Sequence, residues 1–246
     1  MDRVIKITLG IFLVILVAFA SVASYNFYVE TAYRTSLVST DSYRCTITTT
    51  GPLSNVTLFL PLPVNSTGNS AVIGRIGAHD MTGFPGDWTS VLFGTDKATF
   101  LKVTAPGIGQ AAGSSSGPVT ITFSVNTRPS ELIDTRSPLA NDAVFRPVED
   151  LQDSACPAGV GTATGSPSCS SYTTTLYAKY DAAPNAAVTI HAEIIGRNDW
   201  KIFQPGSNEY RNAFDISLTG VSPGWTTAPA TLESGIGSYD VPKLFL

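Results

Sequence analysis

The chain has 246 residues, of which 14% are charged, and its net charge is −4. A mildly acidic chain without a basic stripe excludes nucleic acid as a partner. Charged residues fall below the roughly one quarter that is usual in soluble domains, so hydroxyl and amide groups must cover much of the surface. After the first 30 positions about 215 residues remain, which is enough for one large β-domain or two small sandwiches.

The N-terminus carries an uninterrupted apolar run over Ile7–Ala23, preceded by Arg3 and Lys6. Continued as a helix through Tyr28, this segment reaches about 33 Å, enough to cross a hydrocarbon core of about 30 Å. Basic residues before an apolar helix favour a cytoplasmic N-terminus. The sequence therefore predicts a transmembrane anchor over residues 1–28, with membrane lipid as its partner.

A cleaved signal peptide is the alternative interpretation of the same segment. Ala18-Phe19-Ala20 and Ser21-Val22-Ala23 both place small residues at the spacing of a cleavage site. Both interpretations put the rest of the chain outside the cytoplasm. We expect a plasma-membrane protein that crosses once, with its bulk extracellular.

Residues 29–42 are predicted to form a stem, and beyond them the apolar pattern has a period of two. Short alternating runs separated by Gly, Pro, Asn and Asp predict antiparallel strands. The predicted strands are Tyr43–Thr50, Asn55–Pro63, Ala71–Ile76, Trp88–Phe93, Ala98–Thr104, Val119–Asn126, Tyr172–Tyr180, Ala187–Ile195, Ala213–Leu218 and Thr226–Leu232. The prolines of Asn55–Pro63 predict an edge or terminal strand.

This pattern predicts an all-β fold, with one or two antiparallel β-sandwich domains after the helix. Residues 43–127 and 172–246 are predicted to be its two halves. Residues 128–171 between them lack the pattern and are too long for an ordinary loop. They predict either a short helix near Val148–Asp153 or a functional excursion.

Three cysteines are present, and two of them bracket a stretch without core-forming residues. Cys156 and Cys169 are predicted to form a disulfide. Closing this loop would stabilise the folded state by about 3 kcal/mol in the chain-entropy model. Cys45 lies in a strand-like run, so we expect a buried free thiol, with an intermolecular bridge as the alternative.

The chemistry-bearing motifs are weak. Ser115 stands in a G-x-S-x-G match, but the flanking sequence PGIGQAAGSSSGP is typical of a linker rather than of a strand-turn-helix elbow. His191 and Glu193 share one face of a predicted strand, where a solvated polar face is commoner than a metal pair. A serine hydrolase using Ser115 and His191 is a minor alternative; the sequence predicts no enzyme and no cofactor.

Acidic residues are densest at Glu149, Asp150 and Asp153. Their oxygen atoms would suit Ca²⁺, but the D-x-D-x-D-G spacing is absent. They are weak candidates, and no metal site is predicted.

Two further groups concern the surface. Asn55 and Asn65 begin glycosylation sequons, which predict a glycoprotein if the chain is exported. Trp88, Trp200 and Trp225 lie at strand ends, where their rings could either fill the core or stack on sugars.

The runs NVTLFLPLPV, PGDW, VTIHAEIIGRNDW and SNEYRNAFDISLTG resemble stretches of uncharacterised archaeal membrane-anchored secreted β-proteins. The resemblance covers most of the region from Cys45 to Asp240, and residues 128–171 match least. It implies a surface location and an archaeal source, and it brings no activity, cofactor or functional residue.

We therefore expect a membrane-anchored extracytoplasmic β-domain that acts as a structural or interaction protein of the cell envelope. A neighbouring envelope protein or polysaccharide is the expected partner. A secreted carbohydrate-binding module is the alternative.

Overall fold

The computed structural model describes residues 2–95, 98–109, 117–157, 167–220 and 223–240. Three helices occur among these residues: α1 (Asp2–Ser36), α2 (Ala71–Gly77) and α3 (Pro138–Asn141). The strands are β1 (Val38–Thr49), β2 (Leu53–Pro61), β3 (Pro63–Val64), β4 (Thr89–Gly94), β5 (Thr99–Ile108), β6 (Val119–Thr127), β7 (Val144–Phe145), β8 (Glu149–Ser154), β9 (Ser168–Ala182), β10 (Ala187–Lys201), β11 (Pro205–Thr219) and β12 (Gly224–Gly237).

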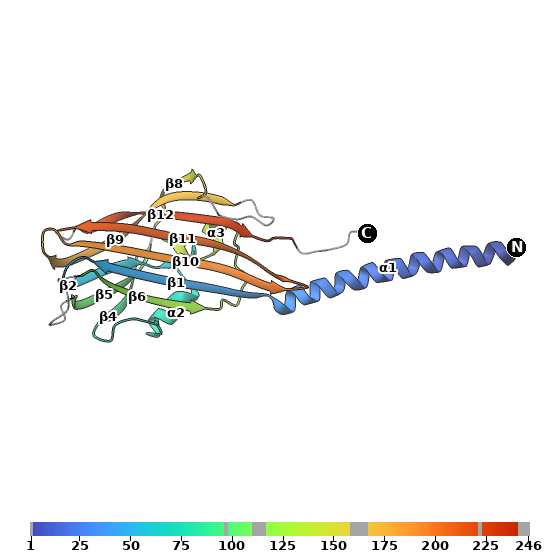
Figure 1. Ribbon diagram of the computed structural model, residues 1–246, viewed down its shortest axis with the longest axis horizontal. Helices are drawn as coiled ribbons and strands as arrows, with labels where there is room; N and C mark the ends of the chain where they lie inside the picture. The colour runs from blue at the N-terminus through green and yellow to red at the C-terminus, as the bar shows by residue number, and fades with distance from the viewer. Residues whose placement is uncertain (1, 96–97, 110–116, 158–166, 221–222, 241–246) are drawn as a thin grey trace.

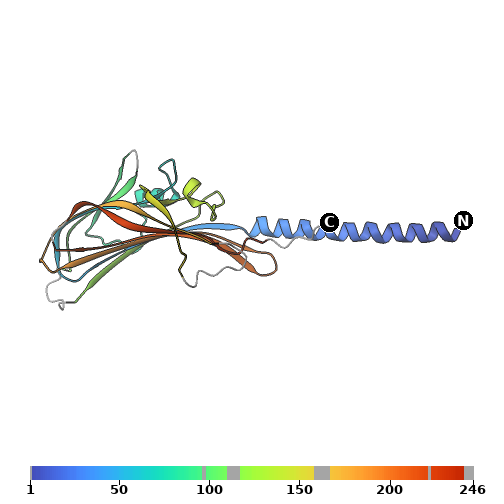
Figure 2. The ribbon, with the colours of Figure 1, turned by 90° about the horizontal axis from the view of Figure 1, so that it is seen from above.

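Most strands belong to one antiparallel sheet with the order β4-β5-β2-β9-β12-β11-β10-β1-β6, and β8 pairs with β9 beside this path. β3 and β7 form a separate small pair. The sheet is long and curls around its core (Figures 1 and 2). The predicted all-β fold class is confirmed, and it takes the form of a curled, sandwich-like antiparallel sheet preceded by a helix.

Alternation along the strands separates the core from the surface. In β1 the side chains of Tyr43, Cys45 and Ile47 are buried, while Thr46 and Thr48 face outward. The outward threonines pair across to β6 through hydroxyl contacts of 3.1 Å. A period of two therefore gives one apolar face and one hydroxyl-covered face, as the low charge content requires.

The predicted halves share this one sheet. β1 pairs with both β6 and β10, and β2 pairs with both β5 and β9. The segment boundaries at 43–127 and 172–246 stay a prediction, but their strands are interleaved rather than stacked as separate sheets.

The prediction of a strand over Ala71–Ile76 is wrong, because these residues form helix α2. Ser70 caps the helix by accepting a hydrogen bond from the Ile73 N–H at 3.3 Å. Val72 and Ile76, four positions apart, are its buried residues. The β-branched residues favour a strand locally, but the N-cap and the burial of residues four positions apart favour the helix more strongly.

The edge position predicted for Asn55–Pro63 is also wrong. β2 lies between β5 and β9, so both of its sides are paired. Its prolines do not interrupt the ladder, because Pro61 is the last residue of β2 and Pro63 starts the separate strand β3. An irregularity in the pairing between Ser54 and Thr57 accommodates Asn55, whose φ is 52°.

A short helix near Val148–Asp153 was one of the two alternatives for the insert, and it is wrong, because Glu149–Ser154 form strand β8. β8 pairs with β9, and Ser154 lies opposite Cys169. The predicted disulfide between Cys156 and Cys169 is present, and Cys156 lies two residues after Ser154. It joins the end of β8 to the beginning of β9. Cys45 is a buried free thiol, and burial raises its pKa to about 12.

Candidate functional site

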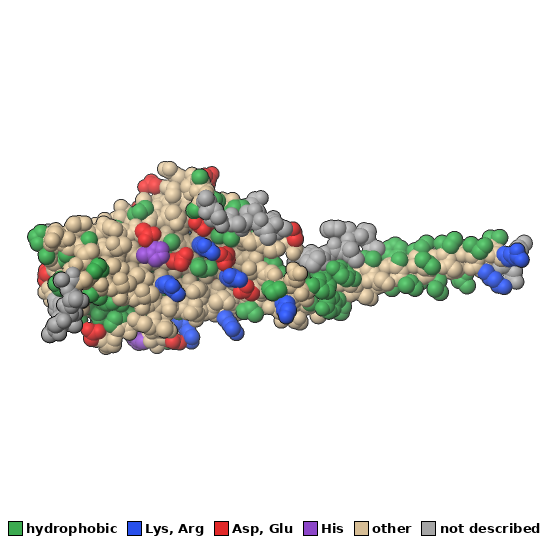
Figure 3. Space-filling model, viewed as in Figure 1, with side chains coloured by type: hydrophobic (Ala, Val, Ile, Leu, Met, Phe, Trp, Pro, Cys, Tyr) green, Lys and Arg blue, Asp and Glu red, His purple; other side chains and the backbone are tan. Residues whose placement is uncertain are grey.

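Helix α1 projects away from the β-domain and exposes apolar side chains along most of its length (Figure 3). It is long and apolar enough to cross a bilayer, and its most apolar window is not buried against the rest of the described chain. Exposing an apolar surface of this size to water is unfavourable, and such surfaces mark sites of contact with a membrane or a protein. The helix is therefore suited to be either a membrane anchor or a signal segment.

The last turns of α1 are attached to the hairpin formed by β10 and β11. The Ser36 hydroxyl oxygen accepts a hydrogen bond from the Lys201 N–H at 2.8 Å. Its single hydrogen lies between the Lys201 carbonyl oxygen at 2.9 Å and the Ala32 carbonyl oxygen of the preceding turn at 2.6 Å. Tyr33 packs edge-on against Trp200, with ring centroids 5.5 Å apart. Val29 is fully buried. The helix thus continues into the domain as a fixed stem.

Phe203 lies at the tip of the same hairpin and reaches back along the helix. Its ring centroid lies 6.1 Å from that of Tyr25 and 5.7 Å from that of Tyr28. Phe203 remains 57% exposed, and its neighbour Phe27 on the helix is 75% exposed. Three aromatic rings, those of Tyr25, Tyr28 and Phe203, therefore gather on the surface where the helix meets the domain.

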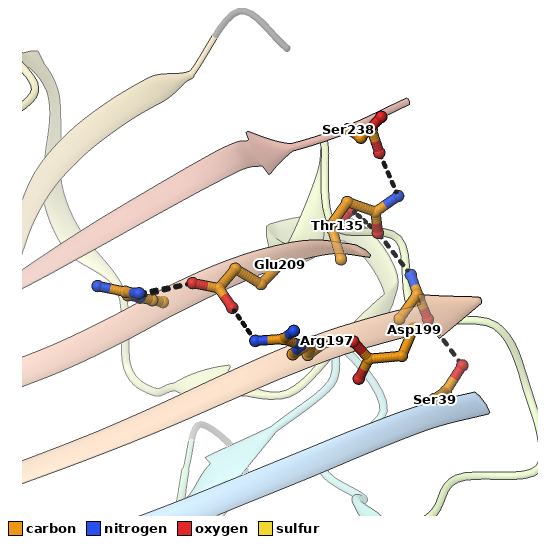
Figure 4. Close-up of polar contacts among 9 residues, drawn as sticks. Ser39, Thr135, Arg197, Asp199, Glu209 and Ser238 are labelled. Atoms are coloured by element: carbon orange, nitrogen blue, oxygen red, sulfur yellow. Dashed lines mark hydrogen bonds and ion pairs between the residues drawn. The ribbon is translucent and has the colours of Figure 1, made fainter. Parts of the chain in front are cut away.

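A buried polar network holds the segment 129–143 against the helix-proximal ends of β10 and β11 (Figure 4). The Asn198 side chain donates to the Ile133 carbonyl oxygen at 2.8 Å and to Asn208 Oδ1 at 2.9 Å. The Thr135 hydroxyl donates to the same Asn208 oxygen at 2.9 Å. Buried amides with several partners fix a loop strongly, because an unpaired group would remain desolvated.

The outward face of these strands carries a line of ion pairs, also drawn in Figure 4. Arg197 contacts Asp199 at 2.9 Å and Glu209 at 3.4 Å, and Arg211 contacts Glu209 at 2.6 Å. Arg197, Asp199 and Arg211 are about half exposed, whereas the Glu209 side chain that both arginines contact is 12% exposed. The pair of Arg197 with Asp199 therefore adds little stability.

The fixed segment forms one wall of an acidic pocket of about 670 Å³. β1 contributes Asp41, and the loop before α2 contributes Asn65 and Asn69. The insert contributes further carboxylates, so that the acidic lining consists of Asp41, Glu131, Asp134 and Asp142. No Lys, Arg or His is among the described lining residues.

Asp41 is the buried member of this group. It is 6% exposed and lies on the core-facing side of β1, in phase with Tyr43 and Cys45. Burial raises the pKa of its carboxyl from the ordinary 3.8 to about 7, and the nearby Asp142 carboxylate adds to the rise. Burial likewise raises the pKa of Asp142 to about 6, against the effect of a hydrogen bond from the Asp134 N–H. Paired, buried carboxyls with raised pKa values mark a candidate site.

A second surface feature is an aromatic patch on the outer face of the sheet. It consists of Phe59, Phe93, Phe100, Tyr177 and Trp225. The Trp225 ring lies 5.3 Å from Tyr177, 5.7 Å from Phe59 and 5.5 Å from Phe100, between centroids. Direct strand pairing aligns Trp225, Tyr177 and Phe59 with Lys102 in one row across four strands. Trp225 is 53% exposed, so the patch offers an accessible aromatic surface.

The three tryptophans therefore differ. Trp88 and Trp200 are buried, the first against Phe84 and the second against Tyr33. Their rings fill space between elements, which leaves Trp225 as the member of the set with an accessible ring for stacking.

Both sequon asparagines lie at the surface. Asn55 is exposed, and its side chain donates to Asp181 at 2.6 Å. Asn65 Oδ1 accepts from the Thr67 N–H at 3.0 Å and from the Thr67 hydroxyl at 2.7 Å. Asn65 also lines the acidic pocket. Their glycosylation stays a prediction.

The remaining candidates do not gather into a site. Ser115 lies outside the described residues. His191 Nδ1 lies 2.8 Å from the exposed Asp215 carboxylate on the next strand. Within the described part of the chain, no three His, Cys, Asp or Glu side chains are placed to hold a metal. Glu149, Asp150 and Asp153 are spread along the exposed strand β8.

The acidic pocket escaped the sequence analysis because its carboxylates are far apart in the chain. One signal was available: Asp41 occupies an inward position of the alternation that continues through Tyr43, Cys45 and Ile47. A carboxyl at an inward position of a strand is buried at a cost in free energy, so it indicates a candidate functional residue.

No protein-family model matches the chain, and neither the curated proteins nor the solved structures contain a match.

Proposed function

We propose that this protein is a single-pass component of a cell envelope, with a cytoplasmic N-terminus and an extracellular β-domain. The exposed apolar surface of α1 supports the anchor. Arg3 and Lys6 at its beginning support the orientation. The disulfide between Cys156 and Cys169 fits an oxidising compartment. The archaeal source implied by the resemblance belongs to the same proposal.

The aromatic residues at the base of the domain support the position of the bilayer. From Ile7 to Tyr28 the helix rises about 33 Å, close to the thickness of a hydrocarbon core. Tyr25, Tyr28 and Phe203 then lie at the outer interface, where aromatic rings are favoured. In this proposal the hairpin of β10 and β11 rests its tip on the membrane, and the domain stands upright.

The proposed role is structural or interactive, with a neighbouring envelope protein as the partner. The observation that carries it is the aromatic patch with its exposed Trp225. Trp225 follows the turn between β11 and β12, and β11 separates that turn from the hairpin tip by about 50 Å. Exposed aromatic clusters with a charged neighbour such as Lys102 are typical of protein interfaces.

Site-specific photo-crosslinking in native membranes tests this role. A crosslinking residue at Val91, which is exposed beside the patch, should give a discrete adduct with an envelope protein. Asp215, exposed on the outer face of β11, is the matched control position and should give none. Equal adducts from both positions, or none from either, would contradict the proposal.

A carbohydrate-binding module is the second candidate function, and the accessible Trp225 ring favours it. Aromatic rings stack on the apolar faces of sugars, and Tyr177 and Phe59 extend the platform. Binding on a glycan array should disappear in Trp225→Ala and persist in Phe203→Ala, which removes an exposed ring elsewhere. Binding that persists in Trp225→Ala would assign it to another surface.

The intact mass of the protein extracted from membranes separates anchor from signal peptide. Retention of Arg3 and Lys6 supports the anchor, whereas a chain beginning near Ser21 or Ser24 would support secretion. Added glycan mass would support modification at Asn55 or Asn65.

The proposed role is not enzymatic. The rival serine hydrolase would need Ser115 and His191 to act together. Labelling of the β-domain by a fluorophosphonate probe, lost in Ser115→Ala, would support the hydrolase and overturn this part of the proposal.

A further inference from the structure

The acidic pocket contains a buried carboxyl whose charge nothing in the described chain balances. Asp41 is 6% exposed and has no hydrogen bond or ion pair with another described residue. A nearly buried carboxylate without such partners is costly, and its oxygens are not fully enclosed but face the open pocket. The placement of this charge there calls for a specific explanation. A bound cation would supply one.

The other groups in the pocket are suited to the same ligand. One oxygen of Asp142 accepts a hydrogen bond from the Asp134 N–H at 2.8 Å, which leaves its second oxygen for another partner. Asp134 itself holds the local turn, since one of its oxygens accepts from the Arg136 and Ser137 N–H groups. The amide oxygens of the lining residues Asn65 and Asn69 are already engaged, because Asn65 Oδ1 accepts from the Thr67 and Asn69 N–H groups and Asn69 Oδ1 accepts from the Ser70 N–H. The free side-chain ligand atoms are therefore carboxylate oxygens.

Two arginines near the pocket wall in sequence, Arg136 and Arg146, are engaged elsewhere, whereas Arg128, next to the lining residue Pro129, is exposed and lines the neighbouring hollow. Arg136 lies over the ring of Tyr239, at 4.2 Å from its centroid. Arg146 donates to the carbonyl oxygens of Val64 and Leu139. The charge of the pocket is therefore not balanced by a basic side chain among its described lining residues.

We propose that this pocket binds a divalent cation of the calcium class, with Asp41 as its buried ligand and Asp142 as the second carboxylate. Calcium takes six to eight oxygen ligands in flexible geometry and accepts amide, hydroxyl, backbone and water oxygens beside carboxylates. Calcium affinity depends on the number of charged ligands and on the rigidity of the site, and extracellular modules bind in the range of about 10⁻⁴ to 10⁻³ M. Magnesium, which demands a strict octahedron, fits a wide pocket less well.

The bound ion would connect two parts of the chain. Asp41 lies at the beginning of the sheet, and Asp142 lies in the long insert that the buried asparagines hold in place. Residues 128–171 would then serve partly to complete a cation site. The proposal does not depend on the identity of the envelope partner.

Calorimetric titration of the full chain in detergent with CaCl₂, after treatment with EDTA, tests the proposal. Calcium should bind the wild type with one site, and Asp41→Asn, which is isosteric, should weaken binding at least tenfold. Asp142→Asn should weaken it as well, while Asp215→Asn, an exposed carboxylate on β11, should bind like the wild type. Magnesium should bind more weakly than calcium.

Thermal unfolding of the same variants provides a second measurement that also reports folding. CaCl₂ should raise the Tm of the wild type more than NaCl at equal ionic strength, and this difference should vanish in Asp41→Asn. Equal calcium binding by the wild type and a folded Asp41→Asn would overturn the proposal. A Tm increase with arginine but not with CaCl₂ would assign the pocket to a cationic side chain of a partner protein instead.

Discussion

Ser36 and Lys201 meet at the point where the helix enters the domain, because the Ser36 hydroxyl lies within hydrogen-bond distance of both the N–H and the carbonyl oxygen of Lys201. Ser36 is the last residue of α1, and Lys201 is the last residue of β10, so the contact joins elements 165 positions apart. It makes the helix and the hairpin one unit at the base of the sheet.

Replacing Ser36 with alanine should loosen this junction. We expect a loss of about 1 kcal/mol in the free energy of unfolding, the usual net value of such hydrogen bonds. Hydrogen exchange at the Lys201 amide should increase in the same variant. Thr35→Ala is the matched control, because the Thr35 hydroxyl bonds within its own helix; an equal effect of both variants would contradict the role of the Ser36 contact.

A nitroxide attached at Phe203→Cys should report a lipid environment. In liposomes its relaxation by oxygen should exceed that by a polar nickel complex, because the hairpin tip is proposed to lie at the bilayer interface. A label at Ser217→Cys, exposed towards the far end of β11, should show the opposite order. The buried thiol of Cys45 should not be labelled in the folded protein. Polar relaxation at both positions would remove the membrane contact of the hairpin.

Removing the disulfide should destabilise the domain without changing its fold. Cys156 and Cys169 are 13 positions apart, and closing a loop of that size is worth about 3 kcal/mol in the chain-entropy model. Denaturant unfolding of the double serine variant measures this loss. Reductant should lower the stability of the wild type by a similar amount and leave the double variant unchanged. A further loss in the double variant would indicate another cross-link.

Stability in the presence of EDTA should fall as the pH rises from about 4 to about 7. The folded state raises the pKa of Asp41 from 3.8 to about 7, so it favours the protonated carboxyl. The stabilising contribution is complete below the unfolded pKa and is lost between the two values. A difference of this size corresponds to roughly 4 kcal/mol, at about 1.4 kcal/mol per pKa unit. Burial also raises the pKa of Asp142 to about 6, so this neighbouring carboxyl titrates in the same range and will broaden the transition.

Asp41→Asn should remove the Asp41 part of this pH dependence and leave the smaller part that comes from Asp142. The neutral amide should make the variant more stable than the wild type at pH 8 in EDTA and about equal to it at pH 4. Parallel stability profiles of the two proteins would show that another group is responsible.

The alternation of apolar and polar residues predicted the buried face of the strands reliably. Alternation through Tyr43, Cys45 and Ile47 identifies the inward face of β1, and the structure buries those side chains. The same alternation cannot show which strands pair, because pairing partners such as β1 and β10 are separated by more than a hundred residues. The local sequence therefore does not show that β2 lies in the interior of the sheet, and its prolines favour the wrong prediction of an edge strand.

The candidate site was harder to predict than the fold for a related reason. Asp41 and Asp142 belong to a strand and to an irregular insert, and neither segment shows a metal-ligand spacing of its own. Trp225 shares its sequence context with Trp88, since both follow a Pro-Gly pair. Only the assembled sheet shows that the first is accessible and the second is covered.

A single residue, Leu37, separates α1 from β1. Such a junction leaves no hinge, so the β-domain acts as a rigid lever on the helix. If α1 tilts by about 10°, an end of the sheet about 50 Å away moves sideways by roughly 9 Å. A small tilt of the anchor would therefore produce a large displacement of the aromatic patch. A force applied at the patch would in turn be transmitted to the helix.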